Sequence, residues 1–120
     1  MAISDDATRE RRERSTPAQW LAAGADVENC YLTTTGRVSG NPHEIEIWFG
    51  VLDATLYLIS GNGPSADWYR NLLADPRVTV RIDDIARAGR ARPVDVPAER
   101  ERAGDLMGAK YVWVATRRSG

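Results

Sequence analysis

Two segments of the chain alternate between apolar and polar residues, which is typical of strands that bury one face. In "HEIEIWF", residues 43–49, the apolar face consists of Ile45, Ile47 and Phe49. In "RVTVRID", residues 77–83, it consists of Val78, Val80 and Ile82. Strands of this kind need partner strands and a covered face, so the chain is expected to fold around a β-sheet.

Three further strands are predicted from residue composition and from the turn residues that bound them. They are expected at residues 28–35 ("ENCYLTTT"), 54–60 ("ATLYLIS") and 87–96 ("RAGRARPVDV"). A short strand at 110–116 ("KYVWVAT") is expected near the end of the chain. Short links join the first three strands along the chain, so an antiparallel meander is the simplest topology for them.

Three helices are predicted from capping residues and helix breakers. The first follows Ser15 or Thr16 and ends at Gly24, the second begins at Ser65 and ends at Asp75-Pro76, and the third covers about 97–108. Helices inserted between groups of strands favour an α+β fold with a closed or nearly closed antiparallel barrel. Residues 1–15 are expected to form a flexible charged arm, and residues 16–120 a single domain.

Composition excludes several classes of protein. The formal net charge is −1, which does not provide the basic excess of a nucleic-acid-binding surface. No apolar run approaches the roughly 18 residues needed to span a membrane, and the charged N-terminus does not resemble a signal peptide, so a cytoplasmic protein is expected. Cys30 is the single cysteine, which excludes an intrachain disulfide and a cysteine-rich zinc site; it is expected to be a core residue.

Two glycine-rich loops are the strongest candidates for a binding site. They are "TGRVSG" after the first of the predicted strands and "SGNGPS" after the third. Each offers backbone N–H groups and hydroxyls of the kind that bind phosphate oxygens, and Arg37 adds a charged donor. The alternative is that each loop is only a turn.

Other candidates have equally plain structural alternatives. Glu44 and Glu46 share one face of a predicted strand, where they would serve acid–base chemistry or form a solvated surface. The aromatic residues would stack on a planar ligand or fill the core; they are Trp48, Tyr57, Trp68 and Tyr69. A catalytic cysteine–histidine pair would have to combine Cys30 with His43, the single histidine.

The sequence between about residues 28 and 85 resembles the deazaflavin-dependent nitroreductase family. The resemblance is carried by "YLTTTGRVSGNP", by the pair Trp48-Phe49 and by "LISGNGPSADWYRNLLADPRVTVRI". It implies a split antiparallel β-barrel with flanking helices, related to the pyridoxamine-phosphate-oxidase-like fold. It also implies binding of coenzyme F420, with hydride transfer to a nitro compound, a quinone or another conjugated acceptor.

The resemblance further implies roles for individual residues. The cofactor's phosphate and acidic tail are expected at Arg37, Val38, Ser39, Gly40 and Pro42. The edge of the deazaflavin ring is expected at Ser60, Gly61, Asn62 and Gly63, with Trp68 and Asn71 closing the site from a helix. Trp48 is expected beside the small-molecule acceptor. Because related barrels often pair, a homodimer is expected.

Two alternative functions remain open from the sequence. One is a split-barrel protein that binds FMN or another planar anionic cofactor, and the other is a ligand carrier without catalytic turnover. The sequence contains no dinucleotide-binding fingerprint, Walker loop or nucleophile elbow. Each of these hypotheses therefore depends on the two glycine-rich loops.

Overall fold

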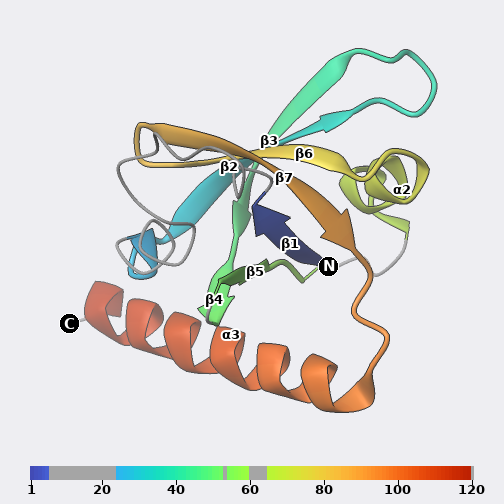
Figure 1. Ribbon diagram of the computed structural model, residues 1–120. Helices are drawn as coiled ribbons and strands as arrows, with labels where there is room; N and C mark the ends of the chain where they lie inside the picture. The colour runs from blue at the N-terminus through green and yellow to red at the C-terminus, as the bar shows by residue number, and fades with distance from the viewer. Residues whose placement is uncertain (6–23, 53, 60–64, 120) are drawn as a thin grey trace.

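The computed structural model describes residues 1–5, 24–52, 54–59 and 65–119, with side chains in the last helix described up to Tyr111. Within these ranges it contains seven strands and two helices (Figure 1). The strands are β1 (Ala2–Asp5), β2 (Asn29–Thr35), β3 (Pro42–Trp48), β4 (Gly50–Leu52), β5 (Thr55–Tyr57), β6 (Arg77–Ile82) and β7 (Ile85–Arg92). The helices are α2 (Asp67–Ala74) and α3 (Pro97–Ser119).

The seven strands form one antiparallel sheet in the order β3-β2-β6-β7-β1-β5-β4. The two strands at the ends of this order, β3 and β4, are separated in the chain by Phe49 alone. The sheet therefore curls until its two edges meet at this residue, whose side chain is fully buried. This arrangement, with α2 and α3 beside the sheet, confirms the α+β class and the split antiparallel barrel with flanking helices.

The predicted meander of the first three strands is wrong. β2 and β3 do form a hairpin, from Asn29 opposite Trp48 to Thr35 opposite Pro42. However, the next strand along the chain does not continue from β3, because the bend at Phe49 carries the chain to the other edge of the sheet. Short links favour neighbouring strands, but closing the barrel pairs β2 with β6 and β5 with β1 instead.

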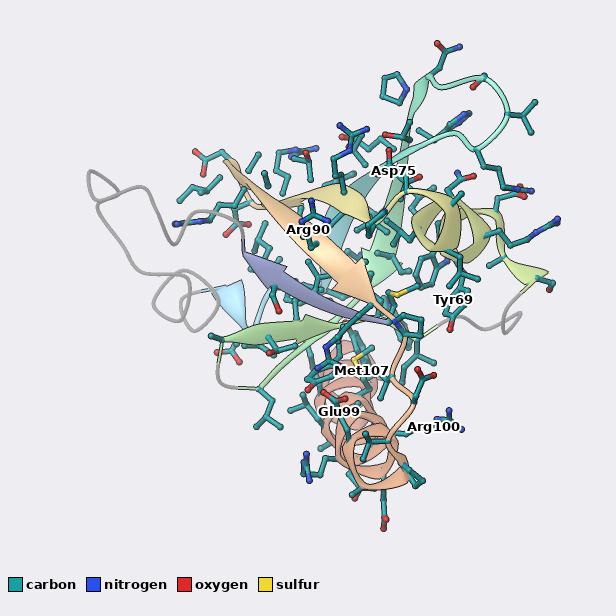
Figure 2. All side chains as sticks on the ribbon, turned by 45° about the vertical axis from the view of Figure 1, so that its right-hand side comes forward. Tyr69, Asp75, Arg90, Glu99, Arg100 and Met107 are labelled. Atoms are coloured by element: carbon teal, nitrogen blue, oxygen red, sulfur yellow. The ribbon has the colours of Figure 1, made fainter. Side chains whose placement is uncertain are left out.

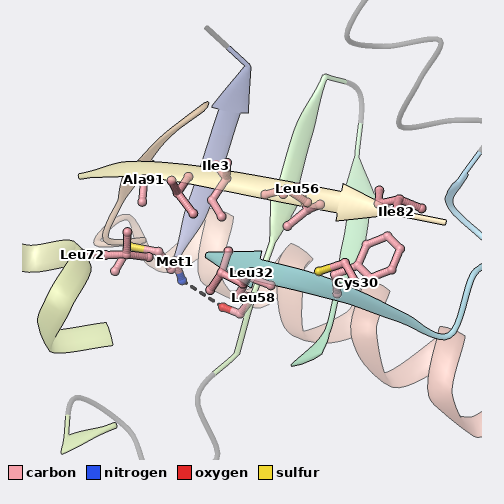
Figure 3. Close-up of a cluster of buried hydrophobic side chains, with 12 residues drawn as sticks. Met1, Ile3, Cys30, Leu32, Leu56, Leu58, Leu72, Ile82 and Ala91 are labelled. Carbon is pink, nitrogen blue, oxygen red and sulfur yellow. Dashed lines mark hydrogen bonds between the residues drawn. The ribbon is translucent and has the colours of Figure 1, made fainter. Parts of the chain in front are cut away.

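The first five residues are also not part of a flexible arm. Ala2–Asp5 form β1, which lies between β5 and β7. The side chains of Met1, Ala2 and Ile3 are buried, and the Met1 nitrogen donates a hydrogen bond to the Leu58 carbonyl at 2.9 Å (Figure 3). Residues 2–5 thus enter the sheet, although the charged residues from Asp5 onward dominate the composition of residues 1–15. Residues 6–15 and the predicted first helix lie outside the described residues.

The core lies between the inner faces of the strands (Figure 3). It includes all three apolar residues predicted from β6, namely Val78, Val80 and Ile82. In β3 and the residue after it, Ile45 and Ile47 are partly buried and pack against the core, and Phe49 belongs to it. Cys30 is a buried core residue, as predicted, and burial raises the pKa of its thiol to about 12. The alternation of buried and exposed residues predicted for residues 43–49 and 77–83 is therefore confirmed.

The helices differ from the predictions at their ends. α3 continues to Ser119, so the strand predicted at 110–116 is wrong. The physical reason lies in the contacts of Lys110 and Tyr111, which both bond to the backbone of Phe49 from adjacent helical positions. α2 stops before Asp75-Pro76 as predicted, but its N-cap is Ala66 rather than Ser65. No helix among the described residues is long and apolar enough to cross a membrane.

Candidate functional site

The turn between β2 and β3 is a tight loop that contains two glycines, Gly36 and Gly40. Gly40 has φ of +74°, a conformation that side chains rarely adopt. A Cβ atom added to Gly36 would lie 2.7 Å from His43 Nε2 and 2.8 Å from Ser39 Oγ, so a larger residue there would have to displace these two exposed side chains. Ser39 Oγ also accepts a hydrogen bond from the Asn41 N–H at 3.1 Å. The glycine-rich sequence therefore encodes one compact turn.

Arg37 links this turn to helix α2. Its Nη1 donates to Asn71 Oδ1 at 2.8 Å, and its backbone N–H donates to the same oxygen at 3.2 Å. Its Nη2 forms an ion pair with Asp67 Oδ1 at 3.2 Å. The structure thus brings together Arg37 and Asn71, two residues that lie 34 positions apart and that the resemblance assigns to the same site.

Asn71 is buried and is held from its other side as well. Its Nδ2 donates to Thr34 Oγ1 at 3.3 Å, and Thr34 is also buried. An amide has one acceptor oxygen and one donor nitrogen, so this pair of contacts fixes the orientation of the Asn71 side chain. Asn71 therefore positions the guanidinium of Arg37 at the mouth of the turn.

A cavity of about 440 Å³ lies between the turn, β3 and α2. It is lined by Thr34, Gly36, Arg37, Val38, Ser39, His43, Glu44, Ile45, Asp67, Trp68 and Asn71. Five residues predicted for the cofactor are among them; these are Arg37, Val38, Ser39, Trp68 and Asn71. Gly40 and Pro42 belong to the turn but are not in this lining, and Ser60, Gly61, Asn62 and Gly63 lie outside the described residues. We call this space the turn cavity.

The chemistry of the turn cavity suits an anion at its turn end. Arg37 Nε makes no hydrogen bond to any described residue, so that edge of the guanidinium remains a donor. Ser39 Oγ accepts from Asn41, which leaves the hydroxyl hydrogen to donate outward. Two carboxylates, Glu44 and Asp67, also line the cavity, and Asp67 already neutralises part of the Arg37 charge. The residues present therefore fit a phosphate group bound through Arg37 and Ser39.

A second cavity, of about 840 Å³, lies between β3 and α3, and we call it the helix cavity. It is lined by Asn29, Glu46, Ile47, Trp48, Ile59, Gly104, Met107, Gly108 and Tyr111. The rings of Trp48 and Tyr111 are stacked within it, with centroids 4.0 Å apart and planes 4° from parallel. Trp48, which the resemblance places beside the acceptor, is therefore outside the turn cavity and beside α3.

Tyr111 and Lys110 contact the helix cavity or its wall but were not predicted as site residues from the sequence. The Tyr111 hydroxyl accepts a hydrogen bond from the Phe49 N–H at 2.7 Å, and its oxygen lies 2.9 Å from the carbonyls of Glu28 and Phe49. Burial raises the pKa of Tyr111 to about 12. Lys110 Nζ donates to the Phe49 carbonyl at 2.9 Å and lies 3.6 Å from the centre of the Phe49 ring.

Burial lowers the pKa of Lys110 to about 8. A signal for Tyr111, though not for Lys110, was present in the sequence. Gly104, Met107, Gly108 and Tyr111 follow the spacing i, i+3, i+4, i+7 of one helix face. The β-branched residues after Tyr111 suggested a strand instead.

The other candidate constellations are not assembled. Glu44 and Glu46 line different cavities, so they do not form a carboxylate pair around one substrate. Cys30 is buried in the core opposite Ile47, whereas His43 is exposed and pairs with Thr34 four residues further along β2. The described residues also contain no cluster of three or more histidine, cysteine or acidic side chains that would hold a metal ion.

The two cavities are neighbours along β3. Ile45 lines the turn cavity and Ile47 lines the helix cavity, and these residues lie on the same face of the strand. Residues two apart in a strand are separated by about 7 Å. The turn cavity, with a charged donor at Arg37, and the aromatic, largely apolar helix cavity therefore lie beside successive parts of one strand.

Comparison with known families identifies the chain. The family model described as F420H(2)-dependent quinone reductase matches residues 6–120, which is nearly the whole chain. No curated protein matches the sequence. The match includes the turn of Arg37, both described helices and every described strand except β1. The chain therefore belongs to the F420H(2)-dependent quinone reductase family, and its cofactor is coenzyme F420.

Proposed function

We propose that this protein transfers hydride from reduced F420 to a quinone or a related conjugated acceptor, with each reactant in one of the two cavities. The observation that carries the proposal is the placement of the turn cavity and the helix cavity along successive residues of β3. The phosphate of the cofactor would be held at the turn, and the acceptor would lie against Trp48. Hydride chemistry is supplied by the bound cofactor, and the protein supplies orientation.

The anion end of the site is supported by the arrangement of Arg37. Asn71 and Asp67 occupy Nη1 and Nη2, so the guanidinium is already oriented before a ligand arrives. An oriented donor loses less conformational freedom on binding, which strengthens a charge-assisted hydrogen bond to phosphate. The adjacent hydroxyl of Ser39 would contribute a second donor.

The acceptor end is supported by its aromatic and apolar lining. Trp48 is half-exposed, and its ring is held parallel to that of Tyr111. Ile47, Ile59 and Met107 also line the cavity, and Glu46 is the only charged side chain among the described lining residues. A planar apolar molecule such as a quinone would bury its rings against these side chains and keep its oxygens at the wetter edge. A nitroaromatic compound has the same shape and is proposed as a second acceptor class.

A competition titration tests the cofactor assignment. The purified protein is titrated with F420 and with FMN, with binding followed by the fluorescence of each cofactor. We expect F420 to bind more tightly, and equal or tighter binding of FMN would overturn this part of the proposal.

Turnover tests the reaction. Reduced F420 is mixed with 1,4-naphthoquinone, and separately with a nitroaromatic acceptor, and its reoxidation is followed by absorbance. We expect reoxidation by the quinone to depend on the protein. Binding of F420 without any reoxidation would instead establish a carrier. As a control, the exposed residue Leu73, which lines neither cavity, is changed to Ser and should leave both assays unchanged.

A further inference from the structure

One face of α3 forms a wall of the helix cavity. The four residues of this face are Gly104, Met107, Gly108 and Tyr111, and all of them line the cavity. Met107 packs toward β4, since a Cβ atom at Gly50 would lie 2.7 Å from its sulfur (Figure 2). Tyr111 stacks on Trp48. The two remaining positions, Gly104 and Gly108, have no side chain to fill the space beside them.

The packing of the helix does not require either glycine. Both glycines are exposed, and among the described residues a Cβ atom at either position would meet no atom within 4 Å beyond the neighbouring backbone of the helix itself. Gly36 and Gly50 are different, because a Cβ atom there would collide with neighbouring side chains. Within a helix, glycine is the least favourable residue apart from proline. Two glycines one turn apart therefore weaken α3 although no described residue requires a glycine at either position. They leave open space beside the helix where it lines the cavity.

We propose that Gly104 and Gly108 determine the size of the acceptor, by keeping room along α3 for a planar molecule of two or more fused rings. This inference rests on the proposed function, because it assigns the helix cavity to the acceptor. The occupant fits the lining, because Trp48 and Ile59 are half-exposed apolar side chains that line the same cavity as the two glycines. A flat apolar molecule would cover both, and its long edge would lie along the strip of bare helix backbone.

The test uses leucine and alanine at the two glycines and quinones of different size. The variants are Gly104→Leu, Gly108→Leu, Gly104→Ala and Gly108→Ala. Ala109→Leu is the matched control, since Ala109 is an exposed residue of the same helix that does not line the cavity. The probes are tetramethyl-1,4-benzoquinone, with one ring, and 9,10-phenanthrenequinone, with three. Binding of each oxidised quinone is measured by calorimetry without cofactor, and kcat/KM is measured with reduced F420.

We expect the two leucine variants to bind phenanthrenequinone at least about tenfold more weakly, because the added side chain occupies the space of the outer rings. Binding of the one-ring quinone should change by less than about twofold, and the same preference should appear in kcat/KM. The alanine variants should show a higher Tm than the wild type, because alanine favours the helix, together with a smaller loss of phenanthrenequinone binding. Ala109→Leu should preserve the size preference of the wild type.

Three results are decisive against the inference. Leucine variants that fold, bind F420 and retain the wild-type ratio between the two quinones would show that the glycines do not limit the acceptor. Equal weakening for both quinones would show a general distortion of the cavity rather than a size limit. Failure of the wild type to bind any quinone would overturn both this inference and the acceptor part of the proposed function. Failure to bind F420 alone would overturn the proposed function but would leave the calorimetric comparison of the quinones valid.

Discussion

Asn71 Oδ1 accepts hydrogen bonds from both the backbone N–H and the guanidinium of Arg37, at 3.2 and 2.8 Å. This one oxygen connects the end of the β2–β3 hairpin to the middle of α2. The Asn71 amide is in turn held by Thr34, so the position of the guanidinium depends on a buried network rather than on a flexible surface side chain. The first two predictions follow from this relationship.

Replacing Arg37 with Ala should weaken F420 binding by about 1.5–3 kcal/mol, the range for a hydrogen bond to a charged group. Added salt should weaken binding to the wild type more than to the variant, because an ionic contact is screened. Fluorescence titration at two salt concentrations measures both effects. The control is Asp67→Asn, which removes the negative charge but keeps a side-chain oxygen that can accept from Arg37 Nη2, and should bind F420 as tightly as the wild type or more tightly. Normal F420 binding by Arg37→Ala at low salt would show that the loop is a turn without a role in cofactor binding.

Replacing Asn71 with Ala should lower the free energy of unfolding by about 1–3 kcal/mol, because Thr34 and Arg37 lose their buried partner. Urea unfolding measures this loss. F420 affinity per folded molecule should fall as well, since the guanidinium is no longer oriented. A stability loss with full affinity would show that Arg37 does not need Asn71 to bind the cofactor.

Trp68 is half-buried, lines the turn cavity and also packs against the core. Trp68→Ala should therefore cost less stability than the roughly 3–5 kcal/mol of a large core truncation, while F420 affinity falls. The matched control is Leu72→Ala, four residues on and buried, which should destabilise by about 2–5 kcal/mol with unchanged affinity per folded molecule. The site assignment fails if Trp68→Ala is strongly destabilised and binds F420 normally.

Tyr111→Phe should destabilise the fold by about 1–3 kcal/mol, because the buried Phe49 N–H loses its acceptor. The pKa of Tyr111 is raised to about 12, so the folded state holds the phenolic proton more tightly than the unfolded state does. The contribution of Tyr111 is therefore complete below the unfolded pKa of about 10 and is lost as the pH rises toward 12. Urea unfolding of the wild type and Tyr111→Phe across this range measures it. A constant difference between the two proteins would contradict the prediction.

Lys110 is the single lysine of the chain, and its pKa is lowered to about 8 by burial. Between that value and the ordinary value of 10.5, the unfolded state binds more protons, so this residue makes stability rise with pH over that interval. Below pH 8 both states hold the proton and the contribution is constant. Reductive methylation with a ¹³C label gives one lysine resonance, whose titration midpoint should lie well below that of an exposed lysine. A midpoint at the ordinary value would show that Lys110 is hydrated.

The local parts of this fold and site were predictable from the sequence. Alternation placed Val78, Val80 and Ile82 in the core, because side chains in a strand point to opposite faces wherever the strand lies. The stop before Pro76 followed from a restriction on the preceding residue's backbone. The motif resemblance selected Arg37 and Asn71 together, and the structure brings them into contact.

Only the tertiary structure decided the features that depend on distant partners. β1 exists because β5 and β7 leave room for a strand between them, and nothing within residues 2–5 encodes that gap. Closure at Phe49 joins two edges that are adjacent in sequence but at opposite ends of the sheet. The extension of α3 through Tyr111, and with it the helix cavity, depends on hydrogen bonds to Phe49, which is 62 positions away. Sequence patterns record the preferences of a residue and its neighbours, whereas pairing and cavity shape follow from how all the elements share one core.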